Sequence, residues 1–214
     1  MHEPRGWHAR GYLPHIEARC TPQFVTWRLH DSLPQSLLDQ WHRDTTRIPW
    51  REANRLLRSR VEQYLDEGHG SALLRNPVAG KIVQDGILFY HGRKYLLHAW
   101  TVMPNHVHAL FTPFDSFELG DIVKPLKGFT SREIHKALGG SGRLWQRDFF
   151  DVLIRDEAHF ERVLNYIEWN PVKAKLCTDP TKWPFGSGNP VARARLRENE
   201  ARAVEVVRNQ VQID

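Results

Sequence analysis

The stretch that determines the fold runs from Lys94 to Thr112 and has the sequence KYLLHAWTVMPNHVHALFT. Its first ten residues, 94–103, form a strongly apolar run with aromatic and β-branched members, which is typical of a strand. Pro104 and Asn105 are turn formers, and residues 106–112 are again apolar. The stretch therefore predicts a β-hairpin.

The segments on either side of this hairpin alternate between strand and helix patterns. The predicted elements are strands at 23–29 and 145–154, and helices at 36–57 (interrupted by Pro49), 77–88, 117–138 and 157–176 (kinked or ended at Pro171). This order predicts an α+β fold, a ferredoxin-like βαββαβ antiparallel sheet with helices on one face and an additional C-terminal helix. The other face is expected to be free to hold a ligand.

Three parts of the chain are distinguished by composition. Residues 1–20 are predicted to be an N-terminal extension, 21–180 the catalytic domain with a helical insertion at about 31–76, and 181–214 a basic C-terminal tail. The arginines of the tail predict either a helix or a mobile arm, which would clamp a nucleic acid or cover the active site. They are Arg193, Arg195, Arg197, Arg202 and Arg208.

The charge balance is slightly basic. Thirty Lys and Arg against 25 Asp and Glu give a formal net charge of +5 and an isoelectric point of about 9.4. This surplus attracts phosphate polyanions, but it is also common in proteins that bind no nucleic acid. The eight tryptophans are either core residues or platforms on which unpaired bases stack.

The positions of the cysteines and the hydropathy of the chain argue against several classes of protein. Cys20 and Cys177 form no CxxC pair, which argues against a disulfide framework and a zinc ribbon. No run approaches 18 apolar residues, and residues 1–10 are polar rather than signal-like. We therefore expect a soluble protein of a reducing compartment with no membrane partner.

Two histidines in the second hairpin strand are candidate metal ligands. His106 and His108 are two residues apart, so their imidazoles project from the same face of a strand. Such a pair supplies half of a divalent-metal site. Because the chain contains 12 histidines, the spacing alone is more typical of hydrogen-bonded or solvent-facing side chains than of ligands.

A second candidate group lies in the last predicted helix. Tyr166 and Asn170 are at positions i and i+4 and therefore neighbours on one helix face. The tyrosine hydroxyl could act as a nucleophile, and the asparagine oxygen could complete a metal site or orient a substrate. The spacing alone favours a packed tyrosine ring and an asparagine that merely precedes a helix-ending proline.

Three motifs in this order resemble those of the REP-associated tyrosine transposases, relatives of the single-tyrosine HUH transposases of simple insertion sequences. They are Met103–His108 (MPNHVH), Trp145–Asp151 (WQRDFFD) and Tyr166–Lys175 (YIEWNPVKAK). Further matching stretches are Gly11–His15, Phe24–Arg28, Leu126–Thr130 and Ile154–Asp156. The resemblance covers roughly residues 10–180, and the three motifs together are far more specific than any one of them.

The resemblance implies a bacterial cytoplasmic enzyme that cleaves and rejoins single-stranded DNA at REP-like hairpins through a 5′-phosphotyrosine. Tyr166 corresponds to the nucleophile, and His106 and His108 to the metal-binding pair. Asn170 corresponds to the residue close to the metal, where many HUH transposases have a longer Gln. The implied cofactor is a divalent metal, Mg²⁺ or Mn²⁺. The implied partner is hairpin-forming single-stranded DNA, and the protein is expected to be a monomer or a homodimer.

Basic residues around these motifs are candidates for contact with the DNA backbone, although each is also typical of a solvated helix face. They are Lys124, Lys127, Arg132, Lys136, Arg147, Lys173 and Lys175. No general base for the tyrosine is evident in the sequence.

Three other functions compete with this interpretation. A catalytically silent, domesticated relative would bind hairpin DNA without forming an adduct. An RRM-type RNA-binding module would need aromatic residues on its central strands, where this chain has His106 and His108. A histidine-triad hydrolase would need a third histidine at the position of Leu110.

Overall fold

A computed structural model of the chain describes residues 5–9, 14–17 and 20–199. The predicted hairpin is present: β4 (Tyr95–Val102) pairs with β5 (His106–Pro113) in antiparallel register. The turn between them is closed by a hydrogen bond from the Met103 amide to the His106 carbonyl, 2.8 Å. Among the described residues, no helix combines the length and apolar character needed to cross a bilayer.

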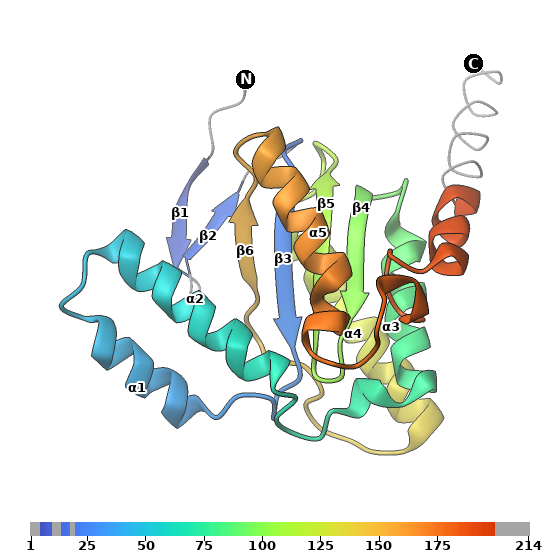
Figure 1. Ribbon diagram of the computed structural model, residues 1–214, viewed down its shortest axis with the longest axis horizontal. Helices are drawn as coiled ribbons and strands as arrows, with labels where there is room; N and C mark the ends of the chain where they lie inside the picture. Colours follow the sequence, from blue (N-terminus) through green and yellow to red (C-terminus); the bar gives the residue numbers. More distant parts are fainter. Residues whose placement is uncertain (1–4, 10–13, 18–19, 200–214) are drawn as a thin grey trace.

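The hairpin belongs to a four-stranded sheet with the order β4-β5-β3-β6, in which all neighbours are antiparallel. Its other strands are β3 (Gln23–Arg28) and β6 (Phe150–Leu153). The predicted α+β fold with an antiparallel sheet is confirmed. A separate two-stranded sheet of β1 (Arg5–Ala9) and β2 (Pro14–Glu17) lies beside β6 (Figure 1).

One face of the sheet is covered by α3 (Pro77–Tyr90) and α4 (Leu119–Leu138) (Figure 1). Alternate strand residues such as Val25, Trp27 and Val107 point into this layer and form the main hydrophobic core with both helices. The exposed polar sides of α3 and α4 therefore lie on the outside of this face.

The other face of the sheet was expected to be free. It instead carries two helices. They are α5 (Glu157–Lys173) and, beside it, α2 (Trp50–Asp66) (Figure 1). Phe24, Leu110 and Ile167 form a smaller core between the sheet and α5. The helix α2 and its partner α1 (Gln35–Thr45) make up most of the predicted insertion at about 31–76. Short 3-10 helices lie at η1 (Leu73–Arg75) and η2 (Pro180–Lys182).

The strand β6 is shorter than the predicted strand at 145–154, and a buried lysine explains the difference. The Nζ atom of Lys127 donates hydrogen bonds of 3.0 to 3.1 Å to the carbonyl oxygens of Gln146, Arg147 and Asp148. These carbonyls point at α4 instead of joining the sheet ladder. Burial lowers the pKa of Lys127 to about 7. Because its ammonium is already bound within the fold, we do not retain Lys127 as a DNA contact.

The first part of the arginine-rich tail packs on the folded body. Residues 190–199 are helical, and Ala192 and Leu196 are buried in the main core. Arg193 pairs with Glu168 of α5, and Arg195 pairs with Asp85 of α3 at 2.6 Å. These two arginines are thus engaged within the chain. Arg202 and Arg208 lie outside the described residues, and the domain boundaries remain predictions.

Candidate active site

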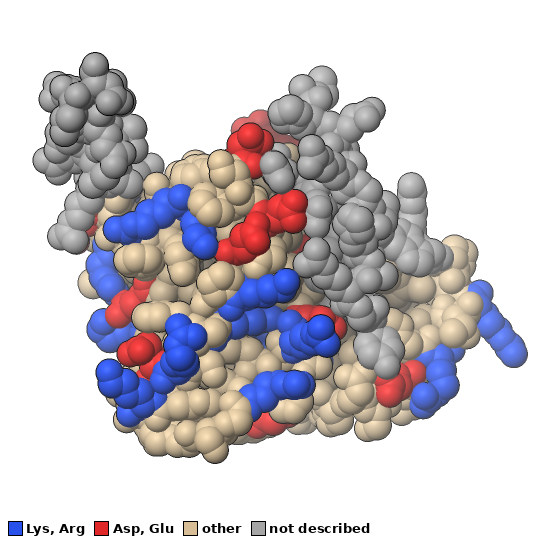
Figure 2. Space-filling model, turned by 180° about the vertical axis from the view of Figure 1, so that it is seen from behind, with Lys and Arg blue, Asp and Glu red and all other residues tan. Residues whose placement is uncertain are grey.

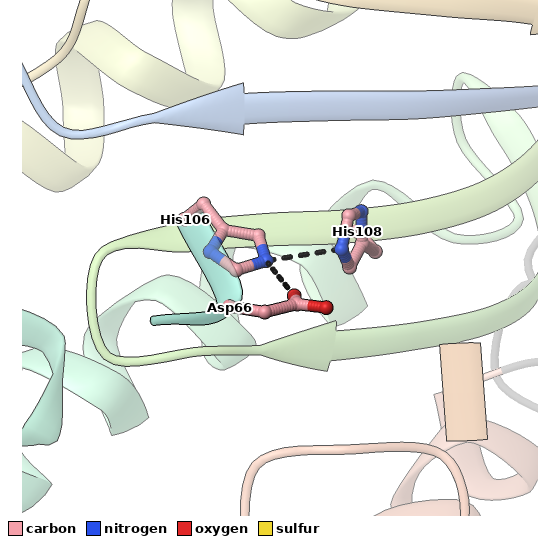
Figure 3. A group of neighbouring side chains, drawn as sticks. All are labelled: Asp66, His106 and His108. Atoms are coloured by element: carbon pink, nitrogen blue, oxygen red, sulfur yellow. Dashed lines mark hydrogen bonds and ion pairs between the residues drawn. The ribbon is translucent and has the colours of Figure 1, made fainter. Parts of the chain in front are cut away.

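The two histidines lie side by side on β5 and face the layer of α5 and α2. Their Nε2 atoms are 3.0 Å apart, and both side chains are fully buried (Figure 3). The strand alternation that places Val107 in the main core turns His106 and His108 to the opposite face.

Each imidazole is oriented by a hydrogen bond at its other ring nitrogen. His106 Nδ1 lies 2.7 Å from Asn105 Oδ1, and His108 Nδ1 lies 2.7 Å from Thr26 Oγ1. The Asn105 amide is itself oriented by donating from Nδ2 to the His69 carbonyl at 2.9 Å. Because Oδ1 can only accept, His106 carries its proton on Nδ1 and presents a lone pair at Nε2. When the Thr26 hydroxyl oxygen likewise accepts a hydrogen bond from His108 Nδ1, both Nε2 atoms are free to bind a cation.

Asp66, the last residue of α2, is a third member of this group that the sequence did not reveal. Its Oδ1 atom lies 3.9 Å from His106 Nε2, and its carboxylate points toward the imidazole pair (Figure 3). The ligand atoms of Asp66, His106 and His108 all lie within 4.8 Å of one another. A carboxylate and two imidazoles that converge in this way are typical of a divalent-metal site.

Burial keeps the imidazoles neutral, which is the state that binds a metal. Burial, assisted by the charge of Lys173, lowers the pKa of His106 to about 3. Burial, His106 and Lys173 lower the pKa of His108 well below its usual value. Both side chains can therefore act as ligands without first losing a proton.

A pH dependence of stability follows from the His106 shift. Between its ordinary pKa of 6.5 and about 3, the unfolded chain binds a proton that the folded metal-free chain does not, so stability falls as the pH is lowered. Between neutral pH and about pH 4, the unfolding free energy of the wild-type protein should fall by about 3 kcal/mol more than that of His106→Gln. Urea unfolding of both proteins with EDTA at several pH values would measure this. A difference that stays constant with pH would contradict it.

Tyr166 reaches the histidines from α5. Its ring centroid is 5.4 Å from that of His108 and 5.9 Å from that of Phe24, which it contacts edge-on. Its hydroxyl oxygen is buried, without a hydrogen bond of normal geometry to another described residue. Burial, then the charges of Glu62 and Asp66, raises the pKa of the phenol far above its usual value. The phenol therefore needs a cation or a proton acceptor before it can act as a nucleophile.

Two further side chains surround the phenol. Asn170 is buried, and its Nδ2 donates to Asp66 Oδ1 at 3.4 Å, while its Oδ1 has no partner among the described residues. Glu62 lies one helical turn before Asp66 on α2 and interacts with the phenol; burial and the charge of Asp66 raise the pKa of its carboxyl. Asn170 thus offers a free oxygen to a cation, and Glu62 offers a proton acceptor that the sequence did not reveal.

The donor set fits the divalent cation that the resemblance implies. His106 and His108 offer two nitrogens, and Asp66 and Asn170 offer oxygens, of which the buried Asn170 Oδ1 lacks any described partner. Oxygen donors favour Mg²⁺ and Mn²⁺, and imidazoles favour Mn²⁺ over Mg²⁺. The four residues could therefore hold either ion.

Replacing Asp66 with Asn should weaken Mn²⁺ binding by about tenfold or more, because the only carboxylate of the group is lost. Isothermal titration with Mn²⁺ at neutral pH would measure the change. Asp85→Asn is the matched control, since Asp85 pairs with Lys81 and Arg195 on the other side of the sheet. Equal Mn²⁺ affinity in wild type and Asp66→Asn would exclude Asp66 as a ligand.

The predicted DNA-contact residues fall into two groups. Lys173 lies at the site, where its Nζ donates to Asp66 Oδ2 at 2.9 Å, and Lys175 is exposed just beyond α5. Exposed Lys124, Arg132 and Lys136 lie on α4, across the sheet from Tyr166, and Arg147 is exposed in the loop before β6. Seen from behind, that side of the molecule carries scattered Lys and Arg with Asp and Glu among them (Figure 2). The α4 residues could therefore reach only DNA on the far side of the sheet from the histidine pair.

Residues 89–170 match the family described as "Transposase IS200 like". This segment contains the hairpin, the histidine pair and the tyrosine helix as far as Asn170, and it is similar to the class of IS200-like transposases. The resemblance to the REP-associated tyrosine transposases is confirmed by two relatives.

The chain is 31% identical over 100 residues to a REP-associated tyrosine transposase of Escherichia coli (strain K12), a match that covers 44% of this chain and 55% of that protein. It is 27% identical over 105 residues to a protein of Haemophilus influenzae (strain ATCC 51907 / DSM 11121 / KW20 / Rd) assigned to the same group, covering 44% and 60%. The chain thus spans somewhat over half the length of these relatives.

A solved structure, described as a REP-associated tyrosine transposase bound to a REP hairpin, is similar with a TM-score of 0.48 and 20% sequence identity. The likeness covers 87% of this chain and 86% of that chain.

Proposed function

We propose that this protein is a metal-dependent transposase that cleaves and rejoins single-stranded DNA at REP-like hairpins, with Tyr166 as the nucleophile. The observation that carries the proposal is the meeting of three elements in one chain. The Tyr166 ring of α5 lies 5.4 Å from the His108 ring of β5, and Asp66 of α2 lies against His106. A nucleophile beside a cation-binding group is the arrangement that phosphoryl transfer needs.

In the proposed reaction, Tyr166 Oη attacks the phosphorus of the scissile phosphate. The bond from phosphorus to the 3′ oxygen breaks, which leaves a 5′-phosphotyrosine and, once that oxygen has taken a proton from water, a free 3′-OH. Glu62, whose carboxyl interacts with the phenol, accepts the phenol proton. Attack by another 3′-OH reverses the step and joins two strands without ATP.

His106, His108, Asp66 and Asn170 would hold the divalent cation. The chemistry that such a cation supplies when bound is Lewis-acid stabilisation of the charge that builds on the phosphate oxygens. The buried surroundings of the site strengthen this effect, because they exclude water from the reacting atoms. Since nucleophile and donor set come from one chain, a monomer suffices for cleavage.

The experiment that tests the proposal is incubation of the purified protein with labelled hairpin-forming single-stranded DNA, with and without Mn²⁺ or Mg²⁺. We expect a covalent protein–DNA band on a denaturing gel only when metal is present. A protein that binds the hairpin but forms no adduct under any of these conditions would instead be the catalytically silent, hairpin-binding relative.

A further inference from the structure

The outward side of α5 carries a line of residues that have no assigned step in the proposed reaction. Arg162, Trp169 and Lys173 follow one another at seven and four residues, which places them on one side of a helix together with the edge of Tyr166. All three are exposed. These three side chains point away from the small core that holds Ile167, whereas the Tyr166 ring packs against that core.

Trp169 is the largest exposed aromatic side chain of this line. Its exposed fraction is 53%, and it makes no ring contact with another described residue. A single exposed apolar side chain is ordinary on a protein surface. Here, however, cationic side chains lie on both sides of the indole, one helical turn from Trp169 at Lys173 and two turns away at Arg162.

The charges of α5 are segregated around the helix. At 100° per residue, Glu157, Glu161 and Glu168 lie on a different side from Arg162, Trp169 and Lys173. Arg162 makes no ion pair with another described residue, and its only described electrostatic neighbour is His159, whose pKa it helps to lower. The line is thus positive without local compensation at its Arg162 end.

We infer that this line, defined as Arg162, Trp169 and Lys173, binds the unpaired DNA strand that runs from the scissile phosphate. Trp169 stacks on a base of this strand, and Arg162 and Lys173 contact phosphates on either side. Aromatic stacking combined with flanking cations is the general mode by which proteins bind single strands without reading a helical groove. The inference rests on the proposed function, because it takes the strand to be the one that Tyr166 cleaves.

The spacing of these residues along α5 suits the binding of a single strand. The rise from Arg162 to Lys173 is about 16 Å along the helix axis, which is enough for a short run of nucleotides. Tyr166 lies within this length on the same helix, and Lys173 Nζ is 5.6 Å from the centroid of its ring, so a strand on the line runs alongside the Tyr166 ring. Lys173, which pairs with Asp66 but remains exposed, can contact a phosphate from the same position.

The test measures binding alone, in EDTA, so that no cleavage occurs. Fluorescence anisotropy would compare a labelled hairpin with an unpaired flank and the same hairpin without it. Trp169→Ala should weaken binding of the flanked hairpin by about tenfold, and Trp169→Phe should retain most of the affinity. Binding of the blunt hairpin should not change. The matched control is Phe89→Ala, because Phe89 is 55% exposed but lies on α3 across the sheet.

A second variant tests the cationic part of the line. Arg162→Ala should lower the salt dependence of flanked-hairpin binding by about 0.7 in the slope of log affinity against log salt, the value for one phosphate contact in a single strand. Equal losses of affinity on both hairpins, or no loss with Trp169→Ala, would overturn the inference. A wild-type protein that binds the flanked hairpin through Trp169 but forms no adduct with metal would refute the proposed catalysis and leave the binding line intact.

Discussion

Replacing Tyr166 with Phe is expected to abolish formation of the covalent protein–DNA adduct. The substitution removes one oxygen atom and preserves the ring that packs edge-on against Phe24 and His108. Because no other group in the proposed reaction can form the phosphotyrosine, adduct formation should fall by at least about a thousandfold. A denaturing gel with labelled hairpin DNA and Mn²⁺ would measure the loss.

The control for this variant is DNA binding in EDTA, which should stay within about twofold of wild type because the phenol oxygen is buried. Tyr64→Phe is a matched substitution: Tyr64 also lies on this side of the sheet, but it stacks on His69 rather than on the histidine pair. Adduct formation at the wild-type rate by Tyr166→Phe would remove the proposed mechanism.

Replacing His106 with Ala should have the second largest effect. The variant loses one imidazole of the cation-binding group and leaves His108 without its neighbour at 3.0 Å. We expect adduct formation to fall by roughly a hundredfold to a thousandfold, since charge on the scissile phosphate is no longer stabilised. The rate of adduct formation at saturating Mn²⁺, together with Mn²⁺ affinity from titration, would show both losses.

His98→Ala is the control for the histidine substitution. His98 is a histidine of the neighbouring strand β4, whose Nε2 pairs with the Thr112 hydroxyl at 2.8 Å, away from the metal-binding group. This variant should keep both Mn²⁺ affinity and adduct formation. If His106→Ala also kept them, the histidine pair would have only a structural role.

The hairpin and the histidine pair could be predicted from the sequence because both depend on local patterns. An apolar run, a Pro-Asn turn and a second apolar run specify β4 and β5 without reference to the rest of the chain. Once residues 106–112 are a strand, the period of two places His106 and His108 on one face. The i, i+4 relation of Tyr166 and Asn170 is equally local and is present in α5.

The contributions of α2 could not be predicted, because they depend on how distant segments pack. Asp66 is 40 residues before His106 and stands at the end of a helix with ordinary amphipathic composition, so no spacing marks it as a ligand. Glu62 lies on the same helix and could not be predicted for the same reason. Both become part of the site only because α2 lies over the sheet face that the βαββαβ pattern leaves open.

The roles of the basic residues also depended on tertiary structure. Lys124, Lys127, Arg132 and Lys136 share one predicted helix, but the sequence does not state which face of the sheet that helix covers. In the structure, α4 lies opposite α5, and Lys127 turns inward to bind three carbonyls. Lys127 follows the apolar Val123 by four residues, and this spacing was the available sign of burial.

The central claim is that the α5 phenol and the β5 imidazoles form one catalytic centre. Its most direct test is mass spectrometry of the proteolysed adduct formed with a short hairpin substrate in Mn²⁺. We predict a single modified peptide in which Tyr166 carries a 5′-phosphonucleotide, and none when EDTA is present. An adduct on any other residue, or one on Tyr166 that forms equally well without metal, would contradict the claim.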